Sequence, residues 1–263
     1  MSLLQCRRCL LGWWNWPAFE PAEFYDRDYF QSGAVAKGYD DYAALEPGLR
    51  RTARTRLRRL AGLLGPGASR APRILDLGCG GGIFLDEAAR RGWKGQGVDA
   101  SAHAVETARG RGLDARQAAL EDLSVESNAY DCVTLWDAIE HMRDPVAVLR
   151  GASAALRPGG VLGLSTGDVT SLCARLSGSA WHLFNLPEHL FFFSPQSLRR
   201  MLFQAGCRVR GITREVSWAP LSYLVERLRK SGVIPLAAPR IGVGRWSVPA
   251  TLCDVLGVYA VRR

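Results

Sequence analysis

The sequence predicts an α/β fold built on a mostly parallel β-sheet. Between residues 73 and 214, short apolar runs alternate with segments of helical periodicity. This alternation is typical of crossover units, in which a helix connects two parallel strands. A glycine-rich loop follows the first strand, at the position where open α/β sheets bind ligands. The length of 263 residues and a hydrophobic content of 48% indicate a large domain with a substantial core, and they exclude a disordered or fibrous chain.

The first half of the alternation is marked by aliphatic runs and a helix cap. Residues 73–78 and 95–100 are expected to be strands, and a helix over 83–91 connects them. Ser101 is placed to cap the next helix, because its hydroxyl can accept a hydrogen bond from a free backbone N–H. A third strand is expected over residues 115–120.

The second half ends in two more distant strands. Residues 130–136 are rich in β-formers, and the helix over 145–156 has a proline in its first turn. A turn at 157–160 precedes a strand over 161–165. The remaining expected elements are a helix from Ser194-Pro195 to Gly206 and strands over 207–214 and 256–261.

Two regions lie outside this alternation. Residues 1–64 are expected to form an N-terminal cap, with an aromatic-rich start and a basic helix over 47–64. Residues 65–263 form the core, which two insertions interrupt at 168–194 and 216–250. We expect these insertions to act as lids that define the substrate.

The chain is basic, with 34 Lys and Arg residues and a formal charge of +9. A positive field favours anionic partners such as nucleotides or nucleic acid, although arginines scattered over an exposed face give the same balance. Seven cysteines at irregular spacing, with no secretion signal, indicate reduced thiols in a cytoplasmic protein. No apolar run is long enough to span a bilayer. An amphipathic face near 221–229 fits a cover over the core or a homodimer contact better than a lipid surface.

The strongest motif is Asp76-Leu77-Gly78-Cys79-Gly80-Gly81-Gly82. Its glycines let the backbone turn tightly and approach a ligand. A dinucleotide-binding loop usually has glycine where Ile83 stands, and the Asp76 carboxylate would repel a pyrophosphate. Asp99 ends the next strand, where a carboxylate can accept hydrogen bonds from both ribose hydroxyls or can cap the following helix. These features predict a nucleoside site with a cationic or hydroxylated group near Asp76.

Further motifs follow the glycine loop and Asp99 in a characteristic order: Tyr130-Asp131, Asp137-Ala138-Ile139-Glu140-His141, Asp144-Pro145 and Leu156-Arg157-Pro158-Gly159-Gly160. With these motifs, the chain resembles the class I S-adenosylmethionine-dependent methyltransferases. Within that class it is similar to the ubiquinone-pathway O-methyltransferases and to bacterial sugar and natural-product methyltransferases. The resemblance covers about residues 73–214 and the last strand. It implies a Rossmann-like seven-stranded sheet with an antiparallel last hairpin, and S-adenosyl-L-methionine as the cofactor.

The resemblance also implies contacts to the methionine part of the cofactor. The backbone of Gly78, Cys79 and Gly80 would run beside it. Asp76 would help to hold the amino group, and Tyr39 would lie near the carboxylate.

On the adenosine side, Asp99 would bind the ribose. Ala119 stands where many relatives carry an acid for the adenine amino group, so a neighbour is expected to make that contact. Trp136 would pack near the adenosyl group or the sulfonium, because an aromatic face suits a cation. The contacts expected on this side come from Asp99, Ala100, Leu120, Glu121, Trp136 and Asp137.

Methyl transfer to a hydroxyl needs a base that removes the hydroxyl proton. His189, in Leu186-Pro187-Glu188-His189-Leu190, is the expected base because it lies in the first lid insertion. Some relatives carry a similar Trp…Pro-Glu-His-Leu segment, which begins here at Trp181. A histidine that only anchors the lid would give the same pattern. His182 is the second candidate.

A divalent metal is an alternative that the sequence does not favour. Some quinone O-methyltransferases hold an ion with an acid–acid–histidine group, for which Asp137, Glu140 and His141 are the matching residues. Such an ion would lower the pKa of a phenolic hydroxyl. Glu140 and His141 can equally cap the turn after the fourth strand.

Cys6 and Cys9 form an isolated C-x-x-C pair. Sugar-modifying relatives can begin with a zinc ribbon whose second half resembles Cys6-Arg7-Arg8-Cys9-Leu10. Because zinc takes four ligands, we interpret the pair as half of a former ribbon. An ion shared by two chains, or a longer N-terminus, would also account for it.

The expected function is methyl transfer to a small molecule, most simply to a hydroxyl of a sugar, phenol or secondary metabolite. A nucleic-acid methyltransferase is an alternative suggested by the charge, but Asp137-Ala138-Ile139 replaces the Asn/Asp-Pro-Pro-aromatic motif typical of base methylation. The glycine spacing opposes an NAD-dependent oxidoreductase. A protein that binds an adenosyl ligand without catalysis is the remaining alternative.

Overall fold

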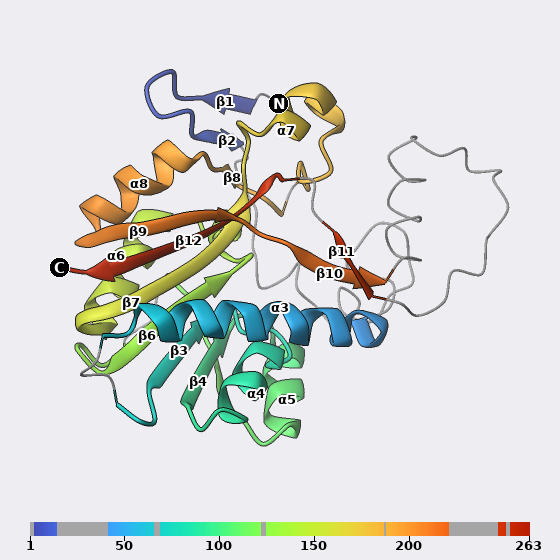
Figure 1. The fold of residues 1–263 in the computed structure, drawn as a ribbon. Helices are drawn as coiled ribbons and strands as arrows, with labels where there is room; N and C mark the ends of the chain where they lie inside the picture. The colour runs from blue at the N-terminus through green and yellow to red at the C-terminus, as the bar shows by residue number, and fades with distance from the viewer. Residues whose placement is uncertain are drawn as a thin grey trace, which may run out of the picture.

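The computed structural model describes residues 3–14, 42–65, 69–121, 125–186, 188–220, 247–250 and 253–263. Its main sheet contains β3 (Arg73–Leu77), β4 (Lys94–Asp99), β5 (Asp114–Gln117), β6 (Tyr130–Trp136), β7 (Leu156–Gly167), β9 (Cys207–Arg214) and β12 (Val255–Arg262). The strand order is β5-β4-β3-β6-β7-β12-β9 (Figure 1). Strands β3 to β7 pair in parallel, and β12 runs antiparallel to both β7 and β9. The predicted Rossmann-like sheet with an antiparallel last hairpin is therefore confirmed.

Helices cover both faces of this sheet (Figure 1). They are α3 (Tyr42–Leu63), α4 (Ile83–Ala89), α5 (Ala102–Gly110), α6 (Pro145–Ala155) and α8 (Pro195–Gln204). Side chains of a strand alternate between the two faces. Leu75 and Leu77 of β3 accordingly join the core that α6 and α8 complete, whereas Ile74 packs with Leu57 of α3 and Phe84 of α4. Burial on both faces explains the nearly continuous apolar character of the central strands.

Helix α3 begins earlier than the sequence predicts. The expected start was Pro47, but the helix covers Tyr42–Leu63 with Pro47 inside it. A proline within a helix removes one backbone hydrogen bond and strains the preceding turn. The buried Ala53, Leu57 and Leu60 recur at helical spacing along the same helix. Their packing against the sheet supplies most of the stability of such a helix.

Strand β7 is longer than predicted. The expected turn at 157–160 belongs to the strand, which starts at Leu156. Leu156 pairs with Tyr130, and the register then shifts before Cys132. Gly159 has a φ of +77° at this point. The glycines therefore form an irregularity within the strand rather than a loop that precedes it.

The N-terminal region contains a hairpin that the sequence did not predict. Strand β1 (Leu3–Gln5) pairs with β2 (Gly12–Trp14), and β2 pairs with β8 (Phe191–Phe192) in the first insertion. The Ser194 hydroxyl at the start of α8 donates to the Cys9 carbonyl at 2.7 Å. Strands this short carry little hydrophobic periodicity, which is why the sequence pattern did not indicate them. The division into a cap over 1–64 and a core over 65–263 stays a prediction.

The two insertions differ in how much of them is described. The first, at 168–194, contains α7 (Leu172–Ser177), the short helix η2 (Gly178–Ala180) and β8. The second, at 216–250, is described at its ends, which pair as β10 (Ser217–Pro220) and β11 (Ser247–Ala250). Its amphipathic face near 221–229 lies outside the described residues. No described helix combines the length and apolar character that a bilayer-spanning segment needs.

Candidate functional site

The carboxyl ends of four adjacent parallel strands form one edge of the sheet. The strands lie in the order β5-β4-β3-β6, and the loop that follows each of them lies at this edge. The glycine loop follows β3, Ala100 follows β4, and Asp137 follows β6. Strand β5 ends earlier than predicted, so Leu120 and Glu121 lie in the segment after it. Tyr39 lies outside the described residues.

The glycine loop approaches the end of β6 closely. Gly78 and Gly80 have φ values of 76° and 52°, in the region that favours glycine. A Cβ on Gly78 would stand 2.8 Å from the Cβ of Ala138. The N–H groups of Gly78 and Cys79 both donate to the Val98 carbonyl of β4. Burial raises the pKa of the Cys79 thiol, so this side chain is a neutral packing group.

Asp99 connects the glycine loop to α5. Its Oδ2 accepts the Gly80 N–H at 2.8 Å, and its Oδ1 accepts the Ser101 N–H at 2.9 Å. The helix cap is Ser101, as predicted, because its side chain accepts the Ala104 N–H. Each carboxylate oxygen has a second lone pair, so Asp99 retains acceptor capacity while two bonds fix its position. Burial raises the pKa of Asp99.

Asp76 lies buried within β3, beside Thr134 of β6. The Thr134 hydroxyl donates to Asp76 Oδ1 at 2.6 Å. Burial and, to a smaller extent, the nearby Asp99 carboxylate raise the pKa of Asp76 to about 7, although the Thr134 hydrogen bond and Arg56 act in the opposite direction. A cation placed beside Asp76 would draw it into the charged form. Sequence reasoning missed Thr134, which the alternation of side chains in β6 places on the same face.

Asp76 is expected to make stability depend on pH. Because folding raises its pKa from 3.8 to about 7, the folded chain keeps a proton that the unfolded chain loses. Stability therefore falls as pH rises from about 4 to about 7 and then levels off. Asp76→Asn removes this titration in the ligand-free protein. At about 1.4 kcal/mol per pKa unit, the stability of the variant relative to the wild type should therefore be roughly 2–4 kcal/mol greater at high pH than at low pH. Urea unfolding at about pH 4 and pH 8 measures this difference, and an equal effect at both pH values would contradict it.

Trp136 ends β6 and faces helix α3. Its ring packs against Phe84 at 5.4 Å and Tyr259 at 6.2 Å between centroids. The guanidinium of Arg56 lies over it at 4.3 Å. The cation that the structure places over Trp136 is therefore an arginine of α3. Arg56 was missed in the sequence, although it falls on the buried stripe of α3 next to Leu57.

Asp137 is held in an unusual backbone conformation. Its φ is +51°, which is strained for a residue with a side chain. Ser165 donates to Asp137 Oδ1 at 2.9 Å, and Arg56 lies 3.4 Å from Oδ2. Glu121, the other acidic candidate, accepts the Arg143 N–H at 2.8 Å. The Asp137 carboxylate thus connects the end of β6 to β7 and α3, and Glu121 connects the segment after β5 to the one that precedes α6.

Glu140, His141 and His189 form a buried cluster beside this edge. One ligand-type atom of each lies within 4.8 Å of the others. Nδ1 of His141 lies 3.0 Å from the Glu188 carbonyl, and Nδ1 of His189 lies 2.8 Å from the Leu183 carbonyl. A carbonyl only accepts, so both Nδ1 atoms carry hydrogen, and the neutral form of each ring has its lone pair on Nε2. Asp137, which the sequence grouped with Glu140 and His141, does not belong to this three-residue group.

The charges in this cluster are set by burial. Burial and the nearby Asp137 raise the pKa of Glu140 to about 8. Burial and His189 lower the pKa of His141 to about 3. Among the described residues, Glu140 Oε2 has no hydrogen-bond partner. A cavity of about 10 Å³ lies against Glu140 and His189, which is enough for one oxygen-sized group. The cluster therefore combines a proton-binding carboxyl with two imidazoles around a small space.

His182, the second candidate for the base, lies apart from this cluster. Its Nδ1 is 3.5 Å from Asp254 Oδ2, just before β12. The structure does not bring His182 into the cluster of Glu140, His141 and His189.

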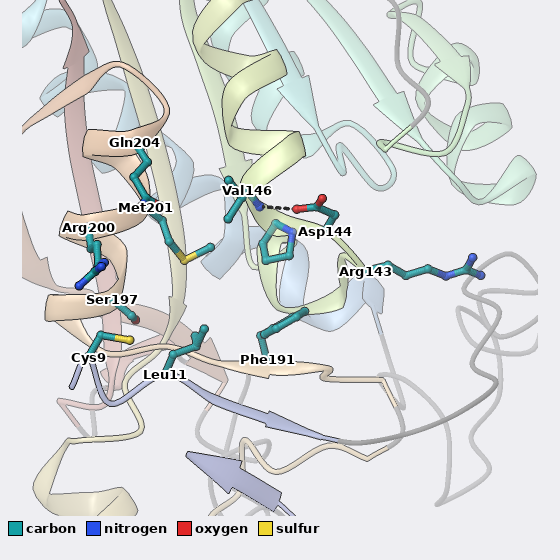
Figure 2. A pocket seen from close by; sticks show the side chains of 11 residues that line it. Cys9, Leu11, Arg143, Asp144, Val146, Phe191, Ser197, Arg200, Met201 and Gln204 are labelled. Carbon is teal, nitrogen blue, oxygen red and sulfur yellow. Dashed lines mark hydrogen bonds between the residues drawn. The ribbon is translucent and has the colours of Figure 1, made fainter. Parts of the chain in front are cut away.

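A larger cavity of about 290 Å³ lies between the N-terminal hairpin, α6 and α8 (Figure 2). Figure 2 shows Asp144 bonded to the Val146 N–H and Arg143 pointing away from the other labelled side chains. No residue that lines it belongs to the glycine loop or to strands β3–β6. The lining residues are Cys9, Leu11, Arg143, Asp144, Pro145, Val146, Phe191, Ser197, Arg200, Met201 and Gln204.

Comparison with known proteins agrees with this arrangement. A family model described as a methyltransferase domain matches residues 48–211. The ubiquinone biosynthesis O-methyltransferase of Aeromonas salmonicida (strain A449) is 34% identical over 163 residues, which cover 57% of this chain and 68% of that protein. The enzyme of the same name from Chromobacterium violaceum is 35% identical over 147 residues, which cover 51% of this chain and 63% of that protein.

A solved structure shows the same fold. The S-adenosylmethionine-dependent methyltransferase from Thermotoga maritima superimposes with a TM-score of 0.55 at 19% identity, over 84% of this chain and 94% of that one. The family match extends from α3 into β9, and it therefore contains the glycine loop, Asp99 and the cluster around Glu140. The chain belongs to the S-adenosylmethionine-dependent methyltransferases, and its cofactor is S-adenosylmethionine.

Proposed function

We propose that the protein transfers the methyl group of S-adenosylmethionine to a hydroxyl of a small molecule, with His189 as the general base. The observation that supports this most directly is the hydrogen bond from His189 Nδ1 to the Leu183 carbonyl. It fixes the tautomer in which Nε2 is the basic nitrogen. The relatives from Aeromonas and Chromobacterium are named as O-methyltransferases, which favours oxygen as the acceptor atom.

The reaction is an in-line displacement. The acceptor oxygen forms a bond to the methyl carbon, the carbon–sulfur bond breaks, and the sulfonium becomes a neutral thioether. The hydroxyl proton passes to His189 Nε2. Positioning of donor and acceptor is worth roughly 7–11 kcal/mol in such reactions, so the residues that orient the cofactor matter as much as the base. We assign this orientation to the glycine loop, Asp76 and Asp99.

Glu140 would support the proton transfer. Its pKa of about 8 means that it is largely protonated at neutral pH. When ionised, its carboxylate would stabilise the imidazolium that forms at His189, because opposite charges attract strongly where water is excluded. Turnover is therefore expected to rise with pH toward about 8.

A divalent ion is the alternative means of activating the hydroxyl. The residues present fit one, because two imidazoles and a carboxyl converge and Glu140 Oε2 is buried without a partner among the described residues. Glu140, His141 and His189 would hold the ion, which would lower the pKa of a bound hydroxyl. His189 would then be a ligand and not the base.

Substitution of His189 tests the proposed base. His189→Gln is expected to lower turnover by about 100-fold or more, as loss of a general base does, and to leave cofactor affinity unchanged. His103→Gln, in α5, is the matched control. Transfer of labelled methyl groups to phenols, sugar nucleotides and glycosides measures turnover, and calorimetry with S-adenosylhomocysteine measures affinity. Undiminished turnover in His189→Gln would exclude His189 from the chemistry.

A chelator separates the two alternatives. We expect the parent protein to keep full turnover in EDTA and the His189→Gln variant to be slow. Loss of turnover in EDTA that a divalent cation restores would favour the ion, provided that the same loss and recovery occur in a His182→Gln variant, whose second group of metal-ligating side chains (Cys173, His182 and Asp254) is incomplete. The small-molecule acceptor, the homodimer and the cytoplasmic location are further expectations from the sequence.

A further inference from the structure

A second group of metal-ligating side chains lies apart from the cluster of Glu140, His141 and His189. One ligand atom each from Cys173, His182 and Asp254 lies within 4.8 Å of the others. Cys173 belongs to α7, His182 follows η2, and Asp254 directly precedes β12. The first insertion thus supplies a thiol and an imidazole, and a segment more than 70 residues further along the chain supplies a carboxylate.

The spacing of these side chains suits a tetrahedral ion. His182 Nδ1 lies 3.5 Å from Asp254 Oδ2, which is longer than a good hydrogen bond. Zinc binds nitrogen and oxygen at about 2.0–2.2 Å, and two ligands of a tetrahedron with such bonds are roughly 3.3–3.6 Å apart. The observed separation is therefore one that two ligands of the same ion can adopt.

The carboxylate is oriented before any ion binds. Asp254 is buried, and the Trp181 indole N–H donates to its Oδ2 at 2.9 Å. Trp181 is itself buried in a small apolar cluster with Ala174, the neighbour of Cys173, and with Phe192. Hydrogen bonds from residues behind the ligands are typical of metal sites, because they fix ligand direction. Cys173 and His182 are partly exposed, so an ion can enter from solvent.

We propose that Cys173, His182 and Asp254 bind a divalent ion of the zinc type, with water as the fourth ligand. A thiolate and an imidazole select zinc-like metals over magnesium and calcium, which prefer oxygen ligands. On binding, the metal–sulfur bond replaces the S–H bond of Cys173, and the proton leaves to solvent.

The ion would stabilise the lid that carries His189. His182 is adjacent to Leu183, whose carbonyl accepts the bond from His189 Nδ1. An ion that joins His182 to Asp254 and α7 would therefore restrain the segment from Trp181 to His189. This role does not depend on which group deprotonates the acceptor.

Cobalt(II) is a suitable probe because its spectrum reports thiolate coordination. We would titrate it into the full chain carrying Cys6→Ser and Cys9→Ser, which removes the other close pair of thiols. The expected result is one equivalent of bound cobalt with a thiolate charge-transfer band. The band should disappear in Cys173→Ser, and His182→Gln should weaken binding at least tenfold. Glu140→Gln, in the other cluster, is the matched control and should leave both unchanged.

Zinc provides an independent readout. It should raise the melting temperature of the parent chain, release one proton per ion, and do neither in the His182→Gln variant. His182 is partly exposed, so this variant is expected to fold even if Cys173→Ser does not. Binding of equal strength in the parent and in His182→Gln, or cobalt binding without a thiolate band, would overturn the proposal.

Discussion

Asp99→Ala is expected to weaken binding of S-adenosylmethionine by about 100-fold. A hydrogen bond to a charged acceptor contributes about 1.5–3 kcal/mol, and Asp99 is assigned to both ribose hydroxyls. The substitution also removes the acceptor for the N–H groups of Gly80 and Ser101. The glycine loop would then lose its connection to α5, and the cofactor would lose both its ribose contact and part of its backbone cradle.

Calorimetry with S-adenosylhomocysteine measures this loss without an acceptor. Asp114→Ala is the matched control, because Asp114 is an exposed carboxyl at the start of β5 that accepts a bond from Gln96. It removes the same charge and should leave affinity within about twofold, as expected for a surface substitution. Affinity of wild-type strength in Asp99→Ala would refute the assigned ribose contact.

Arg56→Met is expected to lower the free energy of unfolding by about 3 kcal/mol, the lower part of the range for removing one partner of a buried ion pair. Arg56 is buried and donates to Glu215 at 3.1 Å and to Ser165 at 2.9 Å. Without it, Glu215 keeps the hydrogen bond from Arg59 but loses one of the two arginines that balance its buried negative charge. Asp137 would also lose the nearby cation in its strained conformation, so the site itself should loosen.

Urea unfolding measures the effect. Arg58→Met is the control, because Arg58 is exposed on the same helix, where it donates to Thr55. Its substitution should change stability by less than about 0.5 kcal/mol. Equal losses in the two variants would show that the buried network contributes nothing beyond the helix surface.

Much of the fold follows from local sequence pattern. The central strands are buried on both faces, so they appear as apolar runs, and the helices between them begin at caps such as Ser101 and Asp144. The glycine loop was predictable because its glycine residues indicate its backbone conformation. Gly78 and Gly80 have positive φ values, which few other residues adopt.

The composition of the Glu140 cluster was not predictable in this way. Residues 137, 140 and 141 are close in sequence, which suggested a group of Asp137, Glu140 and His141. The third member is instead His189, which belongs to the first insertion. Next to it, the Leu190 N–H donates to the Glu140 carbonyl at 2.8 Å and holds the insertion against Glu140. Spacing in the sequence carries no information on such a contact. The same holds for Arg56, whose partners Ser165 and Glu215 lie more than a hundred residues away.

Hydrogen–deuterium exchange with S-adenosylhomocysteine tests most directly whether the cofactor occupies the edge formed by β3, β4, β5 and β6. Amides of residues 78–82 and 99–101 should become protected when the ligand is added, because the ligand covers the glycine loop and the start of α5. Exchange in β9, on the far side of the sheet, should stay unchanged. Protection confined to residues 143–146 and 197–204, around the larger cavity, would place the cofactor elsewhere and contradict this assignment.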